Sequence, residues 1–337
     1  MHRRTLIIGA AAAAGYIRSA RAAASDAAIG LSNGYFGTEW RNQMIAGAQQ
    51  QFDGYKSQGL AGKLIVQQAG ADVNQQIQDI RNMIRQGVAA IAMNPNSPVA
   101  LNGVVNEAKR AGIPVISFDQ AITNPYAINV AVDHYQWGQR YAEWIAKTLD
   151  GRGKVVVMDG IPGHPAAETR RKAAFDTFKR HPGIEIVWSG YGMWDHAKAQ
   201  STMATVIAAQ PRIDGAFVED SMGLGVLRAF QNARRDIPVM TGEAQKAFLL
   251  AWKNEPAMRA FAQPNPPDIS RNAIGIAVRL IAGRKLKPQA ENTVFYPIHQ
   301  EVTRDNLDET LDAMRDKPDS HFLAEWFSEV QLDDLFA

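Results

Sequence analysis

Short apolar runs alternate with longer amphipathic segments over most of this chain, from residue 27 to residue 252. The run at 88–93 (VAAIAM) is apolar at every position, which is typical of a strand buried on both faces of a sheet. Within 38–57, apolar residues recur at four-residue steps, which predicts a helix with one face in a core; they are Trp40, Met44, Ala48 and Phe52. Because helical returns between strands give parallel pairing, the alternation predicts a parallel α/β fold.

The pattern starts again after a short interruption at Thr123-Asn124-Pro125, and a new series of strands and helices follows from 128 to 240. Two successive α/β units of similar size predict two lobes rather than one oversized sheet. The segment Pro264-Asn265-Pro266-Pro267 then has three prolines in four residues, so it must be a non-helical connection.

The first 24 residues are predicted to be a signal peptide. A basic start, His2-Arg3-Arg4, precedes the apolar stretch 5–15, which is too short to span a bilayer, and Ala22-Ala23-Ala24 offers a cleavage site. The arginine pair fits twin-arginine export and ordinary secretion alike, and a buried N-terminal helix is the structural alternative. Cleavage removes four arginines and no acid, so the formal net charge of +2 becomes −2. A nearly neutral mature chain carries no electrostatic footprint for nucleic acid or for anionic lipid.

The chemistry that the sequence lacks narrows the function further. There are no cysteines, which excludes disulfides, thiolate metal sites and cysteine nucleophiles. No Gly-x-Gly, such as that at 151–153, continues as a dinucleotide-binding fingerprint, and the seven histidines show no metal-ligand spacing. No G-x-S-x-G nucleophile elbow is present. We therefore expect a protein that is not an enzyme and uses no cofactor and no metal ion.

Several strings of sequence, in a fixed order, carry a resemblance to a known family. They are Gly30-Leu31-Ser32-Asn33 leading to Trp40-Arg41, GIPVISFD from Gly112 to Asp119, Gly160-Ile161-Pro162-Gly163 leading to Arg171-x-x-Ala174-Phe175, FVEDSMGLG from Phe217 to Gly225, and Ala262-Gln263-Pro264. With these strings behind an export signal, residues 29–283 resemble the periplasmic sugar-binding proteins of the ribose-binding type, which serve ATP-binding-cassette (ABC) importers.

The resemblance implies an α/β fold of two doubly wound parallel-sheet lobes joined by a three-crossing hinge, with crossings near 123–133, 263–267 and 292–297. It divides the chain into a signal peptide (1–24), an N-terminal lobe (27–125 and 264–293) and a C-terminal lobe (126–263 and 294–337). It also implies a monomeric periplasmic protein. Such a protein holds a monosaccharide or sugar alcohol between its lobes and delivers it to the membrane permease of an ABC importer.

The candidate ligand contacts lie at the carboxyl ends of the strands, where open parallel sheets bind ligands. The Asp119 carboxylate can accept hydrogen bonds from sugar hydroxyls, and Arg171, the family's R-x-x-A-F arginine, offers a fork of donors. The rings of Trp40 and Trp194 can pack on sugar C–H groups, although Trp40 is also in phase with the apolar stripe of its helix. The full set is Asn33, Trp40, Asp119, Arg171, Trp194, Glu219 and Gln263.

Two of these positions have a neighbour as competitor. Arg170 competes with Arg171, because the spacing from Gly163 is one residue longer than the family pattern. Asp220 competes with Glu219, which stands where many relatives carry Asn.

Other functions remain as alternatives to import. A ligand-presenting protein for a membrane chemoreceptor and a cleft enzyme acting on a small sugar both fit a two-lobed fold. A sugar-responsive transcription regulator would need a helix-turn-helix segment of about fifty residues at the N-terminus, where this chain has an export signal. Gln120 stands where ribose binders often carry Arg, which leaves the identity of the sugar open.

Overall fold

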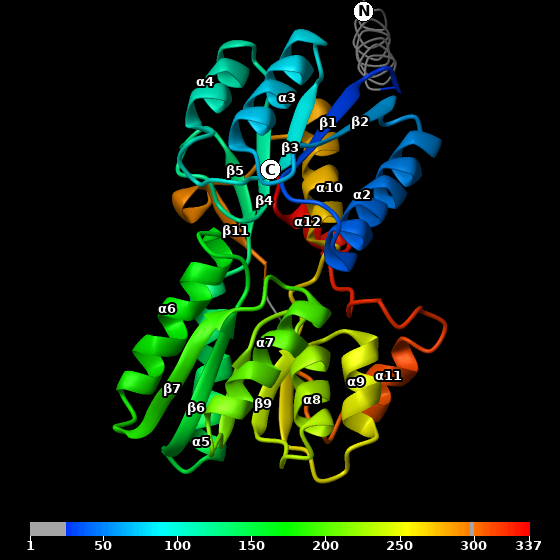
Figure 1. Ribbon diagram of the computed structural model, residues 1–337. Coiled ribbons are helices and arrows are strands. Elements are labelled where there is room, and N and C mark those ends of the chain that lie inside the picture. Colours follow the sequence, from blue (N-terminus) through cyan, green and yellow to red (C-terminus); the bar gives the residue numbers. More distant parts are fainter. Residues whose placement is uncertain (1–24, 297–299) are drawn as a thin grey trace, which may run out of the picture.

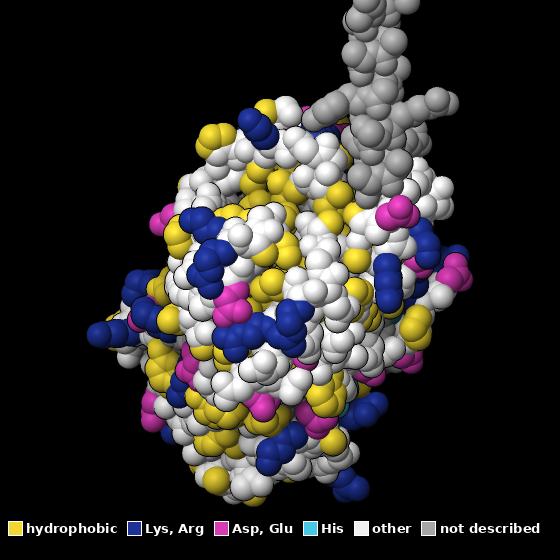
Figure 2. Space-filling view, turned by 90° about the horizontal axis from the view of Figure 1, so that it is seen from above, with side chains coloured by type: hydrophobic (Ala, Val, Ile, Leu, Met, Phe, Trp, Pro, Cys, Tyr) yellow, Lys and Arg dark blue, Asp and Glu magenta, His cyan; other side chains and the backbone are white. Residues whose placement is uncertain are grey.

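The strands form two parallel sheets that lie one above the other, each flanked by helices, so that the chain has two α/β lobes (Figure 1). The computed structural model describes residues 25–296 and 300–337, and the predicted signal peptide lies outside this range. Within it, no helix is long and apolar enough to cross a membrane. Seen from above the first lobe, basic and acidic side chains are interspersed, so this face presents no broad area of one charge (Figure 2).

The first lobe is built on a six-stranded sheet in the order β11-β5-β4-β3-β1-β2, with every neighbouring pair parallel. Its strands are β1 (Ala28–Asn33), β2 (Lys63–Gln68), β3 (Ala90–Asn94), β4 (Val115–Asp119), β5 (Ile128–Ala131) and β11 (Thr293–Phe295). Its helices are α2 (Glu39–Ser57), α3 (Val73–Arg85), α4 (Asn102–Arg110), α10 (Ile269–Ile281) and α12 (Glu329–Asp334), with a short 3-10 helix at Ala290–Asn292.

The second lobe is built on a five-stranded parallel sheet in the order β10-β9-β8-β6-β7. Its strands are β6 (Arg152–Asp159), β7 (Gly183–Tyr191), β8 (Gly215–Val218), β9 (Val239–Glu243) and β10 (Ala260–Gln263). Its helices are α5 (His134–Thr148), α6 (Pro165–Lys179), α7 (His196–Ala209), α8 (Gly223–Asn232), α9 (Lys246–Lys253) and α11 (Leu307–Ala313).

Local sequence signals explain where helices begin and end. The Asp72 side chain accepts a hydrogen bond from the backbone N–H of Asn74 at 2.8 Å and so caps the start of α3. After the same helix, Gly87 takes a φ of +70°, a left-handed conformation that glycine adopts without steric cost. Thr38, which follows the carboxyl end of β1, caps α2 by accepting a hydrogen bond from the backbone N–H of Arg41. This cap places the first turn of α2 at the cleft between the lobes.

The boundary between the lobes differs from the expected one. Strand β5 pairs with β4 and with β11, so residues 128–131 belong to the first sheet, and the chain leaves the first lobe after Ala131 rather than at 125. Strand β11 likewise places Val294 and Phe295 in the first lobe. The interruption at 123–125 is therefore a loop between two strands of one sheet, because an apolar run predicts a strand but not the sheet that it joins.

The C-terminal segment also departs from its expected place. Val302 bridges to Ala262 and α11 packs on α9, both in the second lobe, and the backbone N–H of Leu323 still bonds to that lobe at Ala244. The chain then crosses a fourth time, and α12 packs on α10 of the first lobe. We call residues 302–337 the C-terminal strap.

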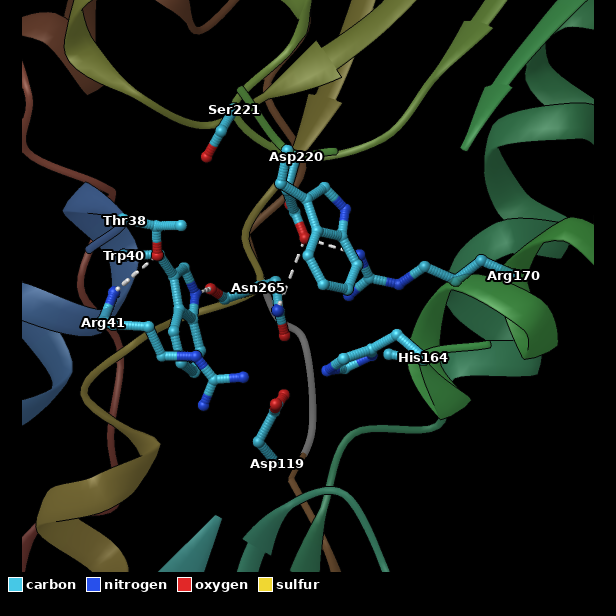
Figure 3. A pocket seen from close by; sticks show the side chains of 11 residues that line it. Thr38, Trp40, Arg41, Asp119, His164, Arg170, Asp220, Ser221 and Asn265 are labelled. Carbon is cyan, nitrogen blue, oxygen red and sulfur yellow. Dashed lines mark hydrogen bonds and ion pairs between the residues drawn. The ribbon is translucent and has the colours of Figure 1, made fainter. Parts of the chain in front are cut away.

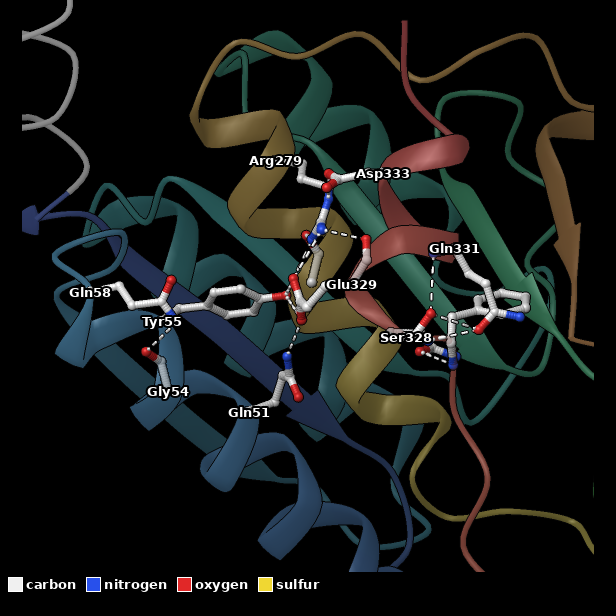
Figure 4. Close-up of polar contacts among 12 residues, drawn as sticks. Gln51, Gly54, Tyr55, Gln58, Arg279, Ser328, Glu329, Gln331 and Asp333 are labelled. Atoms are coloured by element: carbon white, nitrogen blue, oxygen red, sulfur yellow. Dashed lines mark hydrogen bonds and ion pairs between the residues drawn. The ribbon is translucent and has the colours of Figure 1, made fainter.

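The end of the strap is held on the first lobe by a cluster around Arg279 (Figure 4). The Arg279 guanidinium donates to Glu329 at 3.0 Å and to Asp333 at 2.9 Å, and the Tyr55 hydroxyl of α2 donates to Glu329 at 2.8 Å. Leu332, within α12 itself, has a buried side chain. A six-residue helix is not stable alone, so these contacts stabilise α12.

Candidate ligand-binding site

The carboxyl ends of strands from both sheets face one cavity of about 390 Å³ (Figure 3). Both lobes and the crossing between β10 and α10 contribute to its wall. The lining residues are Thr38, Trp40, Arg41, Asp119, His164, Ala166, Arg170, Trp194, Asp220, Ser221 and Asn265.

The wall from the first lobe combines an aromatic ring, a cation and an anion. Trp40 and Arg41 lie in the first turn of α2, and the Trp40 indole N–H donates to the backbone oxygen of Asn265 at 2.6 Å. Asp119 ends β4 in the left-handed region, with a φ of 67°. Its Oδ2 accepts from Asn94 at 3.3 Å, which orients the carboxylate. A ligand in the cavity therefore meets a fixed acceptor on this side.

The wall from the second lobe is centred on Arg170, whose side chain is fully buried on α6. Its guanidinium forms an ion pair with Asp220 and lies 3.9 Å from the centroid of the Trp137 ring. Its Nε donates to Nδ1 of His134 at 3.3 Å, and Nε2 of His134 lies 3.2 Å from the backbone oxygen of Asp119. Arg170 is thus oriented by contacts that reach the first lobe.

The crossing between the lobes adds Asn265 to the wall. Its side-chain N–H donates to Asp220 at 3.4 Å, while its backbone accepts from Trp40. Trp194, on the second lobe, sits in a left-handed turn with a φ of 52° and packs close to Gly160. A Cβ at Gly160 would lie 2.1 Å from the indole, so glycine is required there for the ring to reach the cavity.

The formal charges that line the cavity balance. Two cations, Arg41 and Arg170, face two anions, Asp119 and Asp220. Burial raises the pKa of Asp119, and Arg41 and Arg170 oppose that rise. Burial also raises the pKa of Asp220, against the attraction of Arg170. Burial lowers the pKa of Arg170, but Asp220 and Glu219 outweigh it and the net shift is upward. An uncharged guest leaves this balance undisturbed.

Four polar atoms of lining residues have no hydrogen-bond partner within the residues that the structure describes. Two are acceptors, Oδ1 of Asp119 and Oδ1 of Asn265, one is the Nη2 donor of Arg170, and the fourth is Nδ1 of His164. Buried polar atoms without partners are costly, so a guest that both donates and accepts hydrogen bonds would relieve them. A hydroxyl group does both.

Three of the seven candidate ligand contacts line the cavity: Trp40, Asp119 and Trp194. Glu219 lies directly behind the wall, where its carboxyl accepts from the Trp194 indole at 3.1 Å, and its neighbour Asp220 lines the cavity instead. Burial raises the pKa of Glu219 well above its usual value, which favours the neutral carboxyl.

Arg171 does not line the cavity. It forms an ion pair with Asp159 and donates to the Ser189 hydroxyl at 2.9 Å, on the side of α6 that faces β7. Arg170 lines the cavity in its place. Adjacent positions on a helix are rotated by about 100°, so only one of the two can face the cleft.

Asn33 and Gln263 also lie outside the lining. Asn33 accepts from the Arg41 guanidinium at 3.3 Å and so orients a lining residue. Gln263 donates to the backbone oxygen of Trp137 at 2.7 Å, inside the second lobe. Asn265, two residues further along, lines the cavity instead.

Some residues that line the cavity were not predicted as ligand contacts, because the sequence carries only a weak signal for that role at these positions, or none. Arg41 follows the candidate Trp40 directly, at the start of a helix that faces the cleft. His164 precedes Pro165 at the start of α6, a position that indicates a helix N-terminus and not a ligand contact. The others are Thr38, Ala166, Ser221 and Asn265.

The fold and this cavity define a two-lobed solute-binding protein, in which lobes joined by crossing segments enclose a small polar guest. The chain belongs to the periplasmic binding protein domain family, whose model matches residues 29–285. This is a family of substrate-binding proteins, and the C-terminal strap lies outside the matched residues.

Relatives with assigned ligands cover most of the chain. The ribose import binding protein of Bacillus subtilis is 28% identical over 244 residues, which cover 72% of this chain and 78% of that protein. The xylitol-binding protein of Mycolicibacterium smegmatis is 27% identical over 254 residues, 74% of this chain and 71% of that one. An ABC transporter solute-binding protein from Thermobispora bispora superimposes with a TM-score of 0.84 at 26% identity, covering 91% of this chain and 94% of its own.

Proposed function

We propose that this protein captures one uncharged monosaccharide or sugar alcohol between its lobes and delivers it to the membrane permease of an ABC importer. The observation that carries the proposal is the set of unpartnered donors and acceptors in one charge-balanced cavity. They come from the first lobe (Asp119), the second lobe (Arg170 and His164) and the crossing (Asn265). A guest that bonds to all of them stabilises the closed arrangement of the lobes.

The aromatic residues favour a sugar over other neutral guests. Trp40 and Trp194 reach the cavity from opposite lobes. Sugar rings and polyol chains present C–H groups on one face and hydroxyls at the edge, which suits indole faces beside charged hydrogen-bonding groups. The similarity to ribose-binding and xylitol-binding proteins supports the same class of ligand.

Export and delivery follow from the same assignment. A protein that presents a solute to a permease from outside the cell must be secreted, and the predicted signal peptide at 1–24 supplies that route. We propose that the mature protein works in the periplasm as a monomer, and that closure of the lobes distinguishes the loaded protein from the empty one.

A thermal-shift screen of the mature chain tests the proposal. The panel contains pentoses, hexoses and polyols, together with a sugar acid and an amino sugar of matched size. A neutral solute at one hundred times its Kd stabilises the native state by about 2.7 kcal/mol, which raises the Tm by about 5 °C in a chain of this size. Calorimetry on the hits gives the affinity. A response to charged solutes alone, or to no sugar or polyol, would contradict the proposal.

A further inference from the structure

Two neighbouring residues of the C-terminal strap are buried in different hydrophobic clusters. Phe322 is 3% exposed, and its cluster includes Met44 of α2 and Ile269 of α10, in the first lobe. Leu323 is 7% exposed, and its cluster includes Phe248 of α9, in the second lobe. Successive side chains of an extended segment point to opposite sides. This part of the strap, at the right side of the molecule in Figure 1, therefore lies between the lobes with one side toward each.

Backbone hydrogen bonds fix residues 319–323 to the second lobe. The N–H of Lys246, at the start of α9, donates to the backbone oxygen of His321 at 2.9 Å, and the N–H of Leu323 donates to the oxygen of Ala244 at 2.7 Å. The first N–H groups of a helix have no partner within that helix, so the segment also caps α9. It moves with the second lobe as part of it.

One side chain of the first lobe grips the same segment. The Gln43 amide of α2 donates to the backbone oxygen of Phe322 at 3.1 Å and accepts from the backbone N–H of that residue at 2.9 Å. Its nitrogen also donates to Asp268, directly before α10, at 3.0 Å, which orients the amide. We call the pair of bonds between Gln43 and Phe322 the clasp. The clasp forms only when the first lobe lies against the segment.

A short link then carries the strap onto the first lobe. The N–H of Phe327 donates to the side-chain oxygen of Asn272 on α10 at 3.0 Å. Three residues, 324–326, separate this attachment from Leu323 on the second lobe. An extended chain covers at most about 3.6 Å per residue, so the link reaches about 14 Å between its two attached ends. A tether this short keeps the two halves of the clasp close to each other after they part.

We propose that the strap is a latch: the clasp and the short link hold the lobes together in the absence of a solute. Neither Gln43 nor Phe322 lines the cavity, so the latch favours the closed arrangement whatever the guest is. A solute that binds the closed protein then loses less of its binding free energy to closure. The strap lies outside residues 29–285, which the family model matches. This inference goes beyond the proposed function, because the latch needs no solute.

Distances between spin labels in the solute-free protein test the latch. The chain has no cysteine, so the double variant Asn74→Cys with Lys198→Cys carries the only thiols. Both residues are exposed, in the first turns of α3 and α7, and each of these helices begins at the cleft side of its lobe. Pulsed electron paramagnetic resonance then gives the proportions of closed and open molecules.

Gln43→Ala, made in this labelled protein, opens the clasp. It is expected to lower the ratio of closed to open molecules about 5-fold, the effect of one hydrogen bond after competition with water. Gln49→Ala is the matched control, because Gln49 lies on the same helix but donates to Asp53 of that helix at 2.9 Å. It should leave the distances as they are. A distribution in Gln43→Ala that matches the parent's would overturn the latch.

A lengthened link tests the tether without touching the clasp. Six residues, Gly-Gly-Ser-Gly-Gly-Ser, inserted after Ala324 keep both attached ends and add about 20 Å of reach. We expect the open population and its longest distances to increase. The same insertion after Arg234, in the exposed turn between α8 and β9, is the control and should change neither. Parental distances in the Ala324 insertion would show that the strap does not restrain the lobes, and the proposal would be wrong.

The latch and the proposed function fail separately. Every distance is measured without solute, so a thermal screen in which no sugar or polyol binds would refute the proposed function and leave the latch in place. Unchanged distances in Gln43→Ala would refute the latch and leave the capture of a solute untouched.

Discussion

Replacing Arg170 by methionine is expected to weaken ligand binding at least about 10-fold, because this side chain is the buried centre of the second-lobe wall. Its Nη2 has no partner among the described residues and is a charged donor available to a bound solute. A hydrogen bond from a charged donor contributes about 1.5–3 kcal/mol, so its loss weakens binding by roughly 10- to 150-fold.

The same substitution also affects folding. Arg170 forms an ion pair with Asp220 and lies 3.8 Å from Glu219, both of them buried. Removal of one partner from a buried pair costs about 3–5 kcal/mol, a large part of the roughly 5–15 kcal/mol that stabilises a domain. Arg170→Lys is therefore the second variant. It keeps the positive charge beside Asp220 but loses the planar fork and its stacking on Trp137.

Calorimetry with the solute identified by the thermal screen is the assay, and Arg171→Met is the matched control. Arg171 lies next along the helix but bonds to Asp159 and Ser189, away from the cavity. Its replacement is expected to change the Kd by no more than about 2-fold. Loss of binding in Arg171→Met with parental affinity in Arg170→Lys would refute the assignment of Arg170 to the site.

Three further outcomes are expected. Asp119→Ala weakens binding by about 2 kcal/mol, or about 30-fold, since a buried solute hydroxyl is left unpaired; unchanged calorimetric affinity would remove Asp119 from the site. Burial raises the pKa of Asp159 from 3.8 to about 6 despite the ion pair with Arg171. The folded state therefore binds more protons than the unfolded chain between about pH 4 and 6, and stability falls by up to about 3 kcal/mol as the pH rises through that window. Urea titrations of Asp159→Asn should give a flatter profile, and an unchanged slope would count against this. Arg279→Met releases α12, lowers the free energy of unfolding by about 1–2 kcal/mol and exposes 323–337 to protease; parental resistance would show that the cluster contributes nothing.

Much of the fold follows from periodicity alone. Strand β3 is buried at every position, as its uninterrupted apolar run predicts, and the predicted stripe Trp40, Met44, Ala48 and Phe52 is buried on α2. The sheet to which β5 belongs could not be predicted in this way. Three apolar residues among the four of β5 indicate a strand, but its partners, β4 and β11, are determined by contacts distant in the sequence.

The candidate site was predictable at the level of strand ends and not of single side chains. Parallel sheets bring the ends of β4 and β8 to the cleft, and Asp119 and the pair Glu219–Asp220 lie there. Which member of an adjacent pair faces inward depends on the phase of a turn or helix. At α6 the signal was the spacing from Gly163 to Arg171, one residue longer than the resemblance implies, and the residue that lines the cavity is Arg170.

The C-terminal strap was the least predictable part, because its helices are too short to show a clear period. One signal was present: Ser328 and Gln331 form a reciprocal capping box at the start of α12. Such a motif marks where a helix starts but not the lobe on which it packs. The ion pairs to Arg279 that determine this come from a residue about fifty positions earlier in the chain.

The fourth crossing has a practical consequence for anyone who attaches this protein to a surface or a reporter. Strand β1 begins at Ala28, and the backbone N–H of Ala337 bonds to Lys285, so both ends of the described chain lie on the same lobe. A tether or dye fused at either end is carried by that lobe and leaves the other free to swing. A sensor of lobe movement therefore needs its second probe at an internal site, such as the exposed turn before β7.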